Sequence, residues 1–265
     1  MERIIVCIKP VPDPKQWDQV SLDPKTMTLC REGIPSIINP LDRHAVEAAL
    51  RIKEDQGGEV ALLSMAPPFA VSSLREMLAM GADRAALLSS PAFAGSDTLA
   101  TAHILAAGVK KTGYFDLIIC GDMTLDGSTA QVTSQLAEFL ERPNVMHVSD
   151  LAWPAPETIL LTRRIENGEV RLEARPPLVI SVVKEINKPR YTSFLGIMEA
   201  ENREIAVWSD KDLDLDTSLI GLEGSPTKMA GLHLRESRRA REILSGDPGE
   251  LAGELARRLS RKGLI

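Results

Sequence analysis

The sequence predicts an α/β protein with three layers, in which helices cover both faces of an open parallel sheet on a Rossmann-like scaffold. Short strand-like runs alternate with helical patterns through the first half of the chain, and right-handed βαβ units produce that arrangement. Two of the runs, residues 4–6 and 117–119, are continuously apolar, as strands buried on both faces are. A chain of 265 residues is long enough for one large α/β domain or two smaller ones.

The individual elements follow from this pattern in order. Strands are predicted over residues 3–9, 59–65, 84–89 and 116–120, and helices over 42–56, 71–80, 97–111 and 129–141. Ser96 or Asp97 is suited to cap the start of the third helix. Gly57, Gly81 and Gly113 follow the ends of the first three helices, where glycine accepts the left-handed conformation that ends a helix.

The pattern changes after Pro143. Residues 159–164 and 170–174 flank Asn167-Gly168, which is typical of a β-hairpin turn. A buried strand is expected over 178–184 and a loop over 187–198. The interpretation is an α/β domain over residues 1–208, an acidic linker over 209–227 and a C-terminal helical arm over 228–265, with two short helices broken at 246–249.

Composition narrows the classes of function. The chain is 44% hydrophobic and 26% charged with a net charge of −6, which excludes global disorder and argues against a nucleic-acid partner. No apolar run approaches the ~18 residues of a membrane span. Three widely spaced cysteines fit a reducing cytoplasm. The four histidines are scattered and the common catalytic and phosphate-loop motifs are absent, so a catalytic centre made of side chains is not expected.

The strongest local candidate for a binding site is the run from Gly121 to Val132, where a buried strand leads through a glycine-containing turn into a helix. Such a turn presents free backbone N–H groups and the positive end of a helix to an anion. Ser128 and Thr129 add hydroxyl donors, and Gly127 leaves room for a phosphate to approach the backbone. Asp126 is suited either to cap the helix or to hold a ribose hydroxyl. A capped helix that binds no ligand fits the same residues.

Other strand ends lie at the same edge of a parallel sheet, where ligands of α/β proteins bind. The sequence places residues 7–10, 39–42 and 65–68 there. Their prolines also fit a simpler role, because proline ends strands and begins helices. The segment 187–198 combines apolar side chains with a proline and charges. It either folds onto the core or offers an anchor to a partner protein.

These segments, taken in order, resemble the β subunit of electron transfer flavoprotein. The likeness runs from Ile4 to about Ile205. It includes Ile38-Asn39-Pro40, Asp116 through Gly121, Asp126 through Gln131, and Pro189-Arg190-Tyr191 followed by Gly196-Ile197-Met198. The likeness is closer to the electron-bifurcating type of this family. The family usually carries a basic residue where Asp122 stands.

The resemblance implies an adenine nucleotide site, which holds AMP in the plain type and a second FAD in the bifurcating type. The positions that match this site are Cys7, Asn39, Pro40, Leu41, Asp42, Met65, Gly121, Asp122, Met123, Thr124, Leu125, Asp126, Gly127, Ser128, Thr129, Ala130, Gln131 and Val132. The redox FAD is then held mainly by an α subunit in a heterodimer.

The function implied by the resemblance is electron transfer through FAD. Electrons pass from NADH or an acyl-CoA-type dehydrogenase to a flavoprotein or quinone acceptor, and the flavin supplies the chemistry. A flavin dehydrogenase is the implied redox partner. The implied docking residues are Tyr191, Phe194, Leu195, Ile197 and Met198. The alternative is a stand-alone adenine-nucleotide sensor that uses the same loop without a partner subunit.

Overall fold

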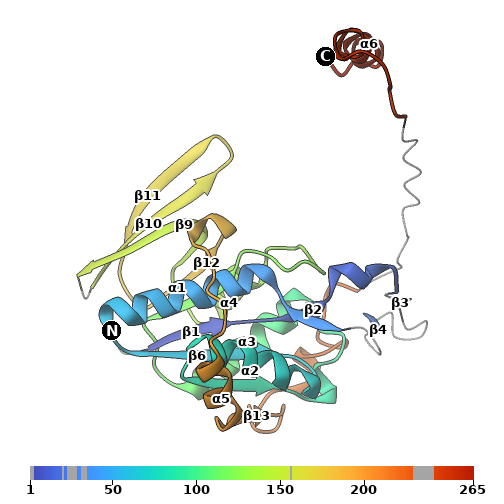
Figure 1. The fold of residues 1–265 in the computed structure, drawn as a ribbon. Coiled ribbons are helices and arrows are strands. Elements are labelled where there is room, and N and C mark those ends of the chain that lie inside the picture. The colour runs from blue at the N-terminus through green and yellow to red at the C-terminus, as the bar shows by residue number, and fades with distance from the viewer. Residues whose placement is uncertain (1–2, 20, 23–28, 31–34, 156, 229–241) are drawn as a thin grey trace. The chain divides into compact units, whose positions relative to one another are not determined.

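Figure 1 shows the computed structural model, which describes residues 3–19, 21–22, 29–30, 35–155, 157–228 and 242–265. The chain divides into two compact units, within residues 1–230 and 231–265. The strands of the first unit are β1 (Arg3–Cys7), β2 (Pro10–Pro12), β3 (Ser21–Leu22), β4 (Leu29–Cys30), β5 (Ser36–Ile38), β6 (Glu59–Met65), β7 (Arg84–Leu88), β8 (Leu117–Gly121), β9 (Asn144–Ala155), β10 (Thr158–Ile165), β11 (Gly168–Ala174), β12 (Leu178–Val182) and β13 (Ile205–Trp208). Its helices are α1 (Pro40–Gln56), α2 (Val71–Met80), α3 (Thr98–Thr112), α4 (Val132–Phe139) and α5 (Phe194–Glu201).

The first unit is built on a nine-stranded sheet with the order β11-β10-β9-β12-β8-β1-β6-β7-β13. Seven neighbouring strands, β9-β12-β8-β1-β6-β7-β13, pair in parallel. The strands β10 and β11 add an antiparallel hairpin beside β9. The structure therefore confirms an α/β fold with a mostly parallel sheet and with a hairpin around Asn167. Figure 1 shows the hairpin extending away from the helices.

Helices lie on both faces of the sheet and bury two separate cores. Helices α1 and α2 pack over alternate side chains of the central strands, such as Ile4 and Val6, on one face. Helices α3 and α4 cover the intervening side chains, such as Ile5 and Ile118, on the other. Because successive strand residues point to opposite faces, a continuous apolar run supplies both cores at once.

Several features differ from the sequence-based expectation. Residues 194–201 form helix α5 where a loop was predicted, and Ser193 caps it by accepting a hydrogen bond from the N–H of Gly196. Helix α4 begins at Val132 rather than 129, because Ser128 and Ala130 have the left-handed φ angles of 49° and 53°. Strands β9 and β13 and the short strands β2, β3, β4 and β5 were not predicted.

The acidic segment 209–227, expected to be a linker, packs against the first unit. Ile220 is buried in the core under α3, and the backbone N–H of Asp97 donates a 2.8 Å hydrogen bond to Ser225 Oγ. The N–H of Thr227 in turn donates to Asp97 Oδ2 at 2.9 Å. This segment therefore belongs with the domain that precedes it.

The second unit contains helix α6 (Pro248–Arg261), capped by Asp247. The other helix expected in the tail falls largely within 229–241, outside the described residues. Leu255 is half exposed on α6, and the helix has no buried residue. Among the described residues, the structure has no helix long and apolar enough to cross a membrane.

Candidate functional site

The parallel strands β1, β6, β8 and β12 end at one edge of the sheet, with Cys7, Met65, Gly121 and Val182 at their last positions. The chain leaves β8 into a loop that reaches α4 at Val132. Residues predicted for the site from four separate parts of the sequence therefore come together at this edge, which is where α/β folds bind ligands.

Asn39 joins the start of α1 to the loop after β8. Its amide nitrogen donates hydrogen bonds of 2.9 Å to Asp42 Oδ1 and to the carbonyl of Met123, and its amide oxygen accepts one of 3.2 Å from the N–H of Leu125. Asn39 is fully buried. Although Asn39 occupies the cap position of α1, its side chain makes no capping bond, because it is used to hold the loop.

Asp42 lies beneath the same loop. Its Oδ2 accepts a 2.7 Å hydrogen bond from the backbone N–H of Lys9, and the residue is only 4% exposed. Burial raises the pKa of Asp42 to about 7, although hydrogen bonds from Asn39 and Lys9 oppose the change. A Cβ at Gly121 would lie 2.3 Å from Asp42 Oδ1, so this position requires glycine.

Two thiols lie side by side beneath the site. Cys7 of β1 is in register with Cys120 of β8, and both belong to the core covered by α3 and α4. The hydrogen bond with Cys120, followed by burial, raises the pKa of Cys7 well above its ordinary value. A thiol in this state is a poor nucleophile. The pair belongs to the apolar core, and the partly buried Met65 packs against the same core.

Lys9 and Asp126 form an ion pair across the site. The ammonium of Lys9 lies 2.8 Å from both carboxylate oxygens of Asp126, whose side chain is 7% exposed. Asp126 also accepts a 2.8 Å hydrogen bond from the N–H of Gly127. The pKa of Asp126 is held below its usual value. Burial acts to raise this pKa, but the charge of Lys9 and these hydrogen bonds outweigh the effect of burial.

The end of the loop presents unused backbone donors. No hydrogen bond within the described part of the chain involves the N–H groups of Thr129 and Ala130, whereas the N–H of Ser128 is bound to the carbonyl of Thr124. The left-handed residues Ser128 and Ala130 flank Thr129 just before the start of α4. Successive N–H groups in such a turn form a concave anion site, strengthened by the positive end of the helix.

Asp122 is paired with residues of β12 and β9. Its Oδ1 accepts a 2.7 Å hydrogen bond from Ser181 Oγ and lies 2.7 Å from Nδ1 of His147. His147 has a φ of 61° at a bulge of β9, and its N–H donates to Ser181 Oγ at 2.9 Å. Of the predicted loop residues, Asp122 therefore has a structural role toward β12 and β9.

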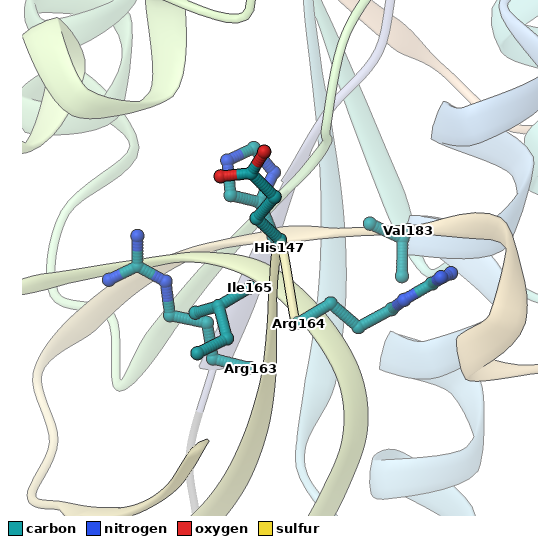
Figure 2. A pocket seen from close by; sticks show the side chains of 6 residues that line it. His147, Arg163, Arg164, Ile165 and Val183 are labelled. Atoms are coloured by element: carbon teal, nitrogen blue, oxygen red, sulfur yellow. The ribbon is translucent and has the colours of Figure 1, made fainter. Parts of the chain in front are cut away.

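His147 also borders a hollow of about 570 Å³ (Figure 2). Arg163 and Arg164 of β10 and Val183, just after β12, lie around it. Its lining includes none of the residues that the sequence assigned to the nucleotide site. The sequence analysis noted His147 only as one of four scattered histidines, because a bulge leaves no signal in the pattern of apolar residues.

The predicted docking residues form an exposed apolar surface on and beside α5. The five side chains, which we call the docking surface, are Tyr191, Phe194, Leu195, Ile197 and Met198, with exposed fractions between 47% and 91%. Helix α5 packs closely on α2, because a Cβ at Gly196 would lie 2.3 Å from the carbonyl oxygen of Ala79. The structure thus assigns this segment to the surface rather than to the core.

An anchor on α1 fixes the chain leading to the docking surface. Arg190 donates hydrogen bonds to Glu47, which is 3% exposed, and to Glu54. Asn187 Nδ2 donates to the carbonyl of His44 at 2.9 Å. Burial alone raises the pKa of Glu47, but hydrogen bonds from Arg190 and Arg51 hold it below its ordinary value.

Comparisons with known proteins identify the family. A sequence model of the electron transfer flavoprotein domain matches residues 26–213. The chain belongs to the electron transfer flavoprotein family. It is 44% identical over 265 residues to the caffeyl-CoA reductase-Etf complex subunit CarD of Acetobacterium woodii, covering 99% of this chain and all of that protein. It is 43% identical to the electron transfer flavoprotein subunit beta of Thermoanaerobacterium thermosaccharolyticum, covering 99% of each.

A further relative is the acryloyl-CoA reductase electron transfer subunit gamma of Anaerotignum propionicum, which is 37% identical over 99% of this chain and all of that protein. Each of these three relatives covers 99% of this chain. The resemblance to β subunits of electron transfer flavoproteins is therefore confirmed, and with it a role in electron transfer.

Proposed function

We propose that this chain is the β subunit of a heterodimeric electron transfer flavoprotein, and that it binds an adenine nucleotide at the loop 121–132. The observation that carries the proposal is the pair of unused N–H groups at Thr129 and Ala130, next to the start of α4. Phosphates bind at such helix-terminal loops through backbone donors alone.

The residues around the loop fit the rest of a nucleotide. Cys7 and Met65 provide an apolar lining at the ends of β1 and β6. Asn39 and Asp42 hold the backbone of the loop from below, so its donors are already ordered before a ligand arrives. Preorganised donors of this kind reduce the entropy that binding costs.

We place the redox FAD mainly on an α subunit, and the second nucleotide, AMP or another FAD, on this chain. Bound FAD supplies the capacity to accept and release electrons. The residues of this chain hold the nucleotide and exclude water from its apolar side. The name of the Acetobacterium relative, a subunit of a reductase-Etf complex, supports a multi-subunit assembly.

The docking surface is proposed to bind a flavin-containing dehydrogenase. The apolar side chains at 191–198 stand on a helix held firmly by α2 and by the Arg190 anchor. An exposed apolar group on a rigid support is typical of the anchors that dominate protein interfaces. NADH or an acyl-CoA-type dehydrogenase is the proposed electron donor, and a flavoprotein or a quinone oxidoreductase the acceptor.

The C-terminal arm 228–265 is proposed to contact the α subunit. Helix α6 exposes Leu255 beside charged residues, including the Glu254–Arg258 pair at 2.7 Å. A helix with an apolar stripe and no buried residue of its own is suited to cover a neighbouring subunit.

Co-expression with the gene next to that of this chain tests the proposal. We expect a yellow complex of two polypeptides, with nucleotides identified by chromatography after denaturation. Two FAD per complex supports the bifurcating type, and one FAD with one AMP supports the plain type. A colourless chain that purifies alone and binds an adenine nucleotide would instead support the stand-alone sensor. A chain with neither partner nor nucleotide would contradict both functions.

A further inference from the structure

Lys9 is a cation at the edge of the sheet where the nucleotide is proposed to bind. The loop 121–132 itself contains no lysine or arginine, but it contains Asp122 and Asp126. Asp42 lies buried directly below it. A phosphate that carries about −1.5 to −2 charges at pH 7 therefore enters a site rich in carboxylates.

Two of these carboxylates are compensated within the chain. Asp122 is paired with His147 and Ser181. Asp42 has a raised pKa and hydrogen-bond donors on both oxygens. The third carboxylate, Asp126, is paired with Lys9. The ammonium of Lys9 ends a flexible four-carbon stem, and this side chain is 38% exposed.

Asp126 uses the same kinds of donors that a phosphate would use. Its carboxylate accepts from the ammonium of Lys9 and from the backbone N–H of Gly127, each at 2.8 Å. An ammonium and a glycine N–H are the donor set found at glycine-containing phosphate loops. The ion pair thus holds Lys9 over the loop that begins at Gly121 and carries the free N–H groups of Thr129 and Ala130.

We propose that Lys9 is a ligand of the nucleotide phosphate, and that Asp126 competes with the phosphate for its ammonium. The proposal rests on the proposed function, and it goes further by assigning the charge recognition to a residue outside the loop. Lys9 then selects phosphorylated adenine nucleotides over the bare nucleoside, because only the phosphate interacts with the ammonium. When no phosphate is bound, Asp126 holds this cation at the edge of the loop.

Isothermal titration of the full-length chain, with its partner subunit if the two co-purify, tests this after bound nucleotide is removed by dialysis. AMP and adenosine are titrated separately into the wild-type protein and into Lys9→Met. A charge-assisted contact is worth about 1.5–3 kcal/mol, so we expect a tenfold to hundredfold loss of AMP affinity. We expect the affinity for adenosine to change by less than about twofold, because adenosine carries no phosphate to contact the ammonium.

Three further variants sharpen the result. Lys9→Arg retains most of the AMP affinity because it keeps the charge, and Lys110→Met, at the far end of α3 from the site, leaves both affinities unchanged. Asp126→Asn raises the affinity for AMP but not for adenosine, because it frees the ammonium. Lys9→Gln replaces Lys9→Met if the thermal unfolding of the latter shows a damaged fold.

Unchanged AMP affinity in Lys9→Met, or equal losses for AMP and adenosine, would overturn the role of Lys9 and leave the nucleotide site itself intact. If the wild-type protein binds neither compound, the proposed nucleotide site fails, and the role of Lys9 fails with it.

Discussion

Helix α1 serves two regions whose buried carboxylates behave in opposite ways. At its start, Asp42 faces the loop after β8 and has a pKa raised to about 7 by burial. One and a half turns later, Glu47 faces the chain before the docking surface and has a lowered pKa. The difference is the nature of the donors, because Asp42 accepts from neutral N–H groups whereas Glu47 accepts from two guanidinium groups.

The comparison sets the region proposed to bind a nucleotide against the region proposed to bind a protein. In the loop region, the polar side chains form hydrogen bonds with the loop backbone, and two backbone N–H groups stay without a partner in the described part of the chain. The docking region uses strong ion pairs for rigidity and leaves apolar side chains open.

The titration of the two carboxylates gives the largest expected effect. The folded chain keeps a proton on Asp42 that the unfolded chain releases above about pH 4. The contribution of Asp42 to the free energy of unfolding therefore decreases between pH 4 and 7, on the order of 4 kcal/mol at 1.36 kcal/mol per pKa unit. The contribution of Glu47 is instead lost as the pH falls. Carboxyl carbon NMR should give a midpoint near 7 for Asp42 and one below the ordinary value for Glu47. Two similar midpoints would remove the contrast.

A substitution in the docking surface gives the next largest expected effect. Replacing Leu195 by Glu places a charge on a 64% exposed apolar contact, and we expect electron transfer from the partner dehydrogenase to slow by about 100-fold. Thermal stability should stay unchanged, since the side chain already faces solvent. Leu219→Glu, with 51% exposure elsewhere on the chain, is the matched control. Similar rates for the two variants in a steady-state assay would place docking elsewhere.

Breaking the anchor on α1 tests the rigidity of the docking region. Arg190→Ala leaves Glu47 buried with Arg51 as its remaining cation, and we expect a destabilisation of about 2–3 kcal/mol in urea unfolding. Arg257→Ala removes the exposed pair with Glu254 and should cost less than about 1 kcal/mol. Equal costs would show that the Arg190 pairs are no more important than an exposed ion pair.

Two glycines of the loop separate fold from binding, with the smallest effect on stability. Gly121→Ala brings a Cβ to 2.3 Å from Asp42 Oδ1 and should cost about 1–3 kcal/mol. Gly127→Ala meets Thr124 Oγ1 only at 3.5 Å and should change stability by less than about 0.5 kcal/mol. A bulkier Val at Gly127 is expected to weaken nucleotide binding without unfolding the chain. Chemical denaturation and nucleotide titration of the variants measure both effects.

The sequence was sufficient for the regular part of the fold. Continuous apolar runs identified β1 and β8, and glycines marked the ends of α1, α2 and α3, because these signals are local. Strand β9 was not predicted because its buried and exposed side chains alternate irregularly and because it bulges at His147. Helix α5 escaped because its stability comes from packing on α2 through Gly196, which no local pattern shows.

The site was predictable only in part. The rule that parallel strands end at one edge was enough to bring together Asn39, Asp42 and the loop after β8. The Lys9–Asp126 pair joins residues 117 positions apart, and the sequence analysis considered Asp126 only as a cap or a ribose ligand. The pairing of Asp122 with His147 likewise depends on a bulge in β9 and not on any spacing along the chain.

A crystal structure of the protein with AMP tests the central claim most directly. The account predicts a phosphate oxygen within about 2.7–3.2 Å of the backbone nitrogens of Thr129 and Ala130, with adenosine toward Cys7 and Met65. A phosphate bound elsewhere on the chain, or an empty loop in crystals saturated with AMP, would contradict it.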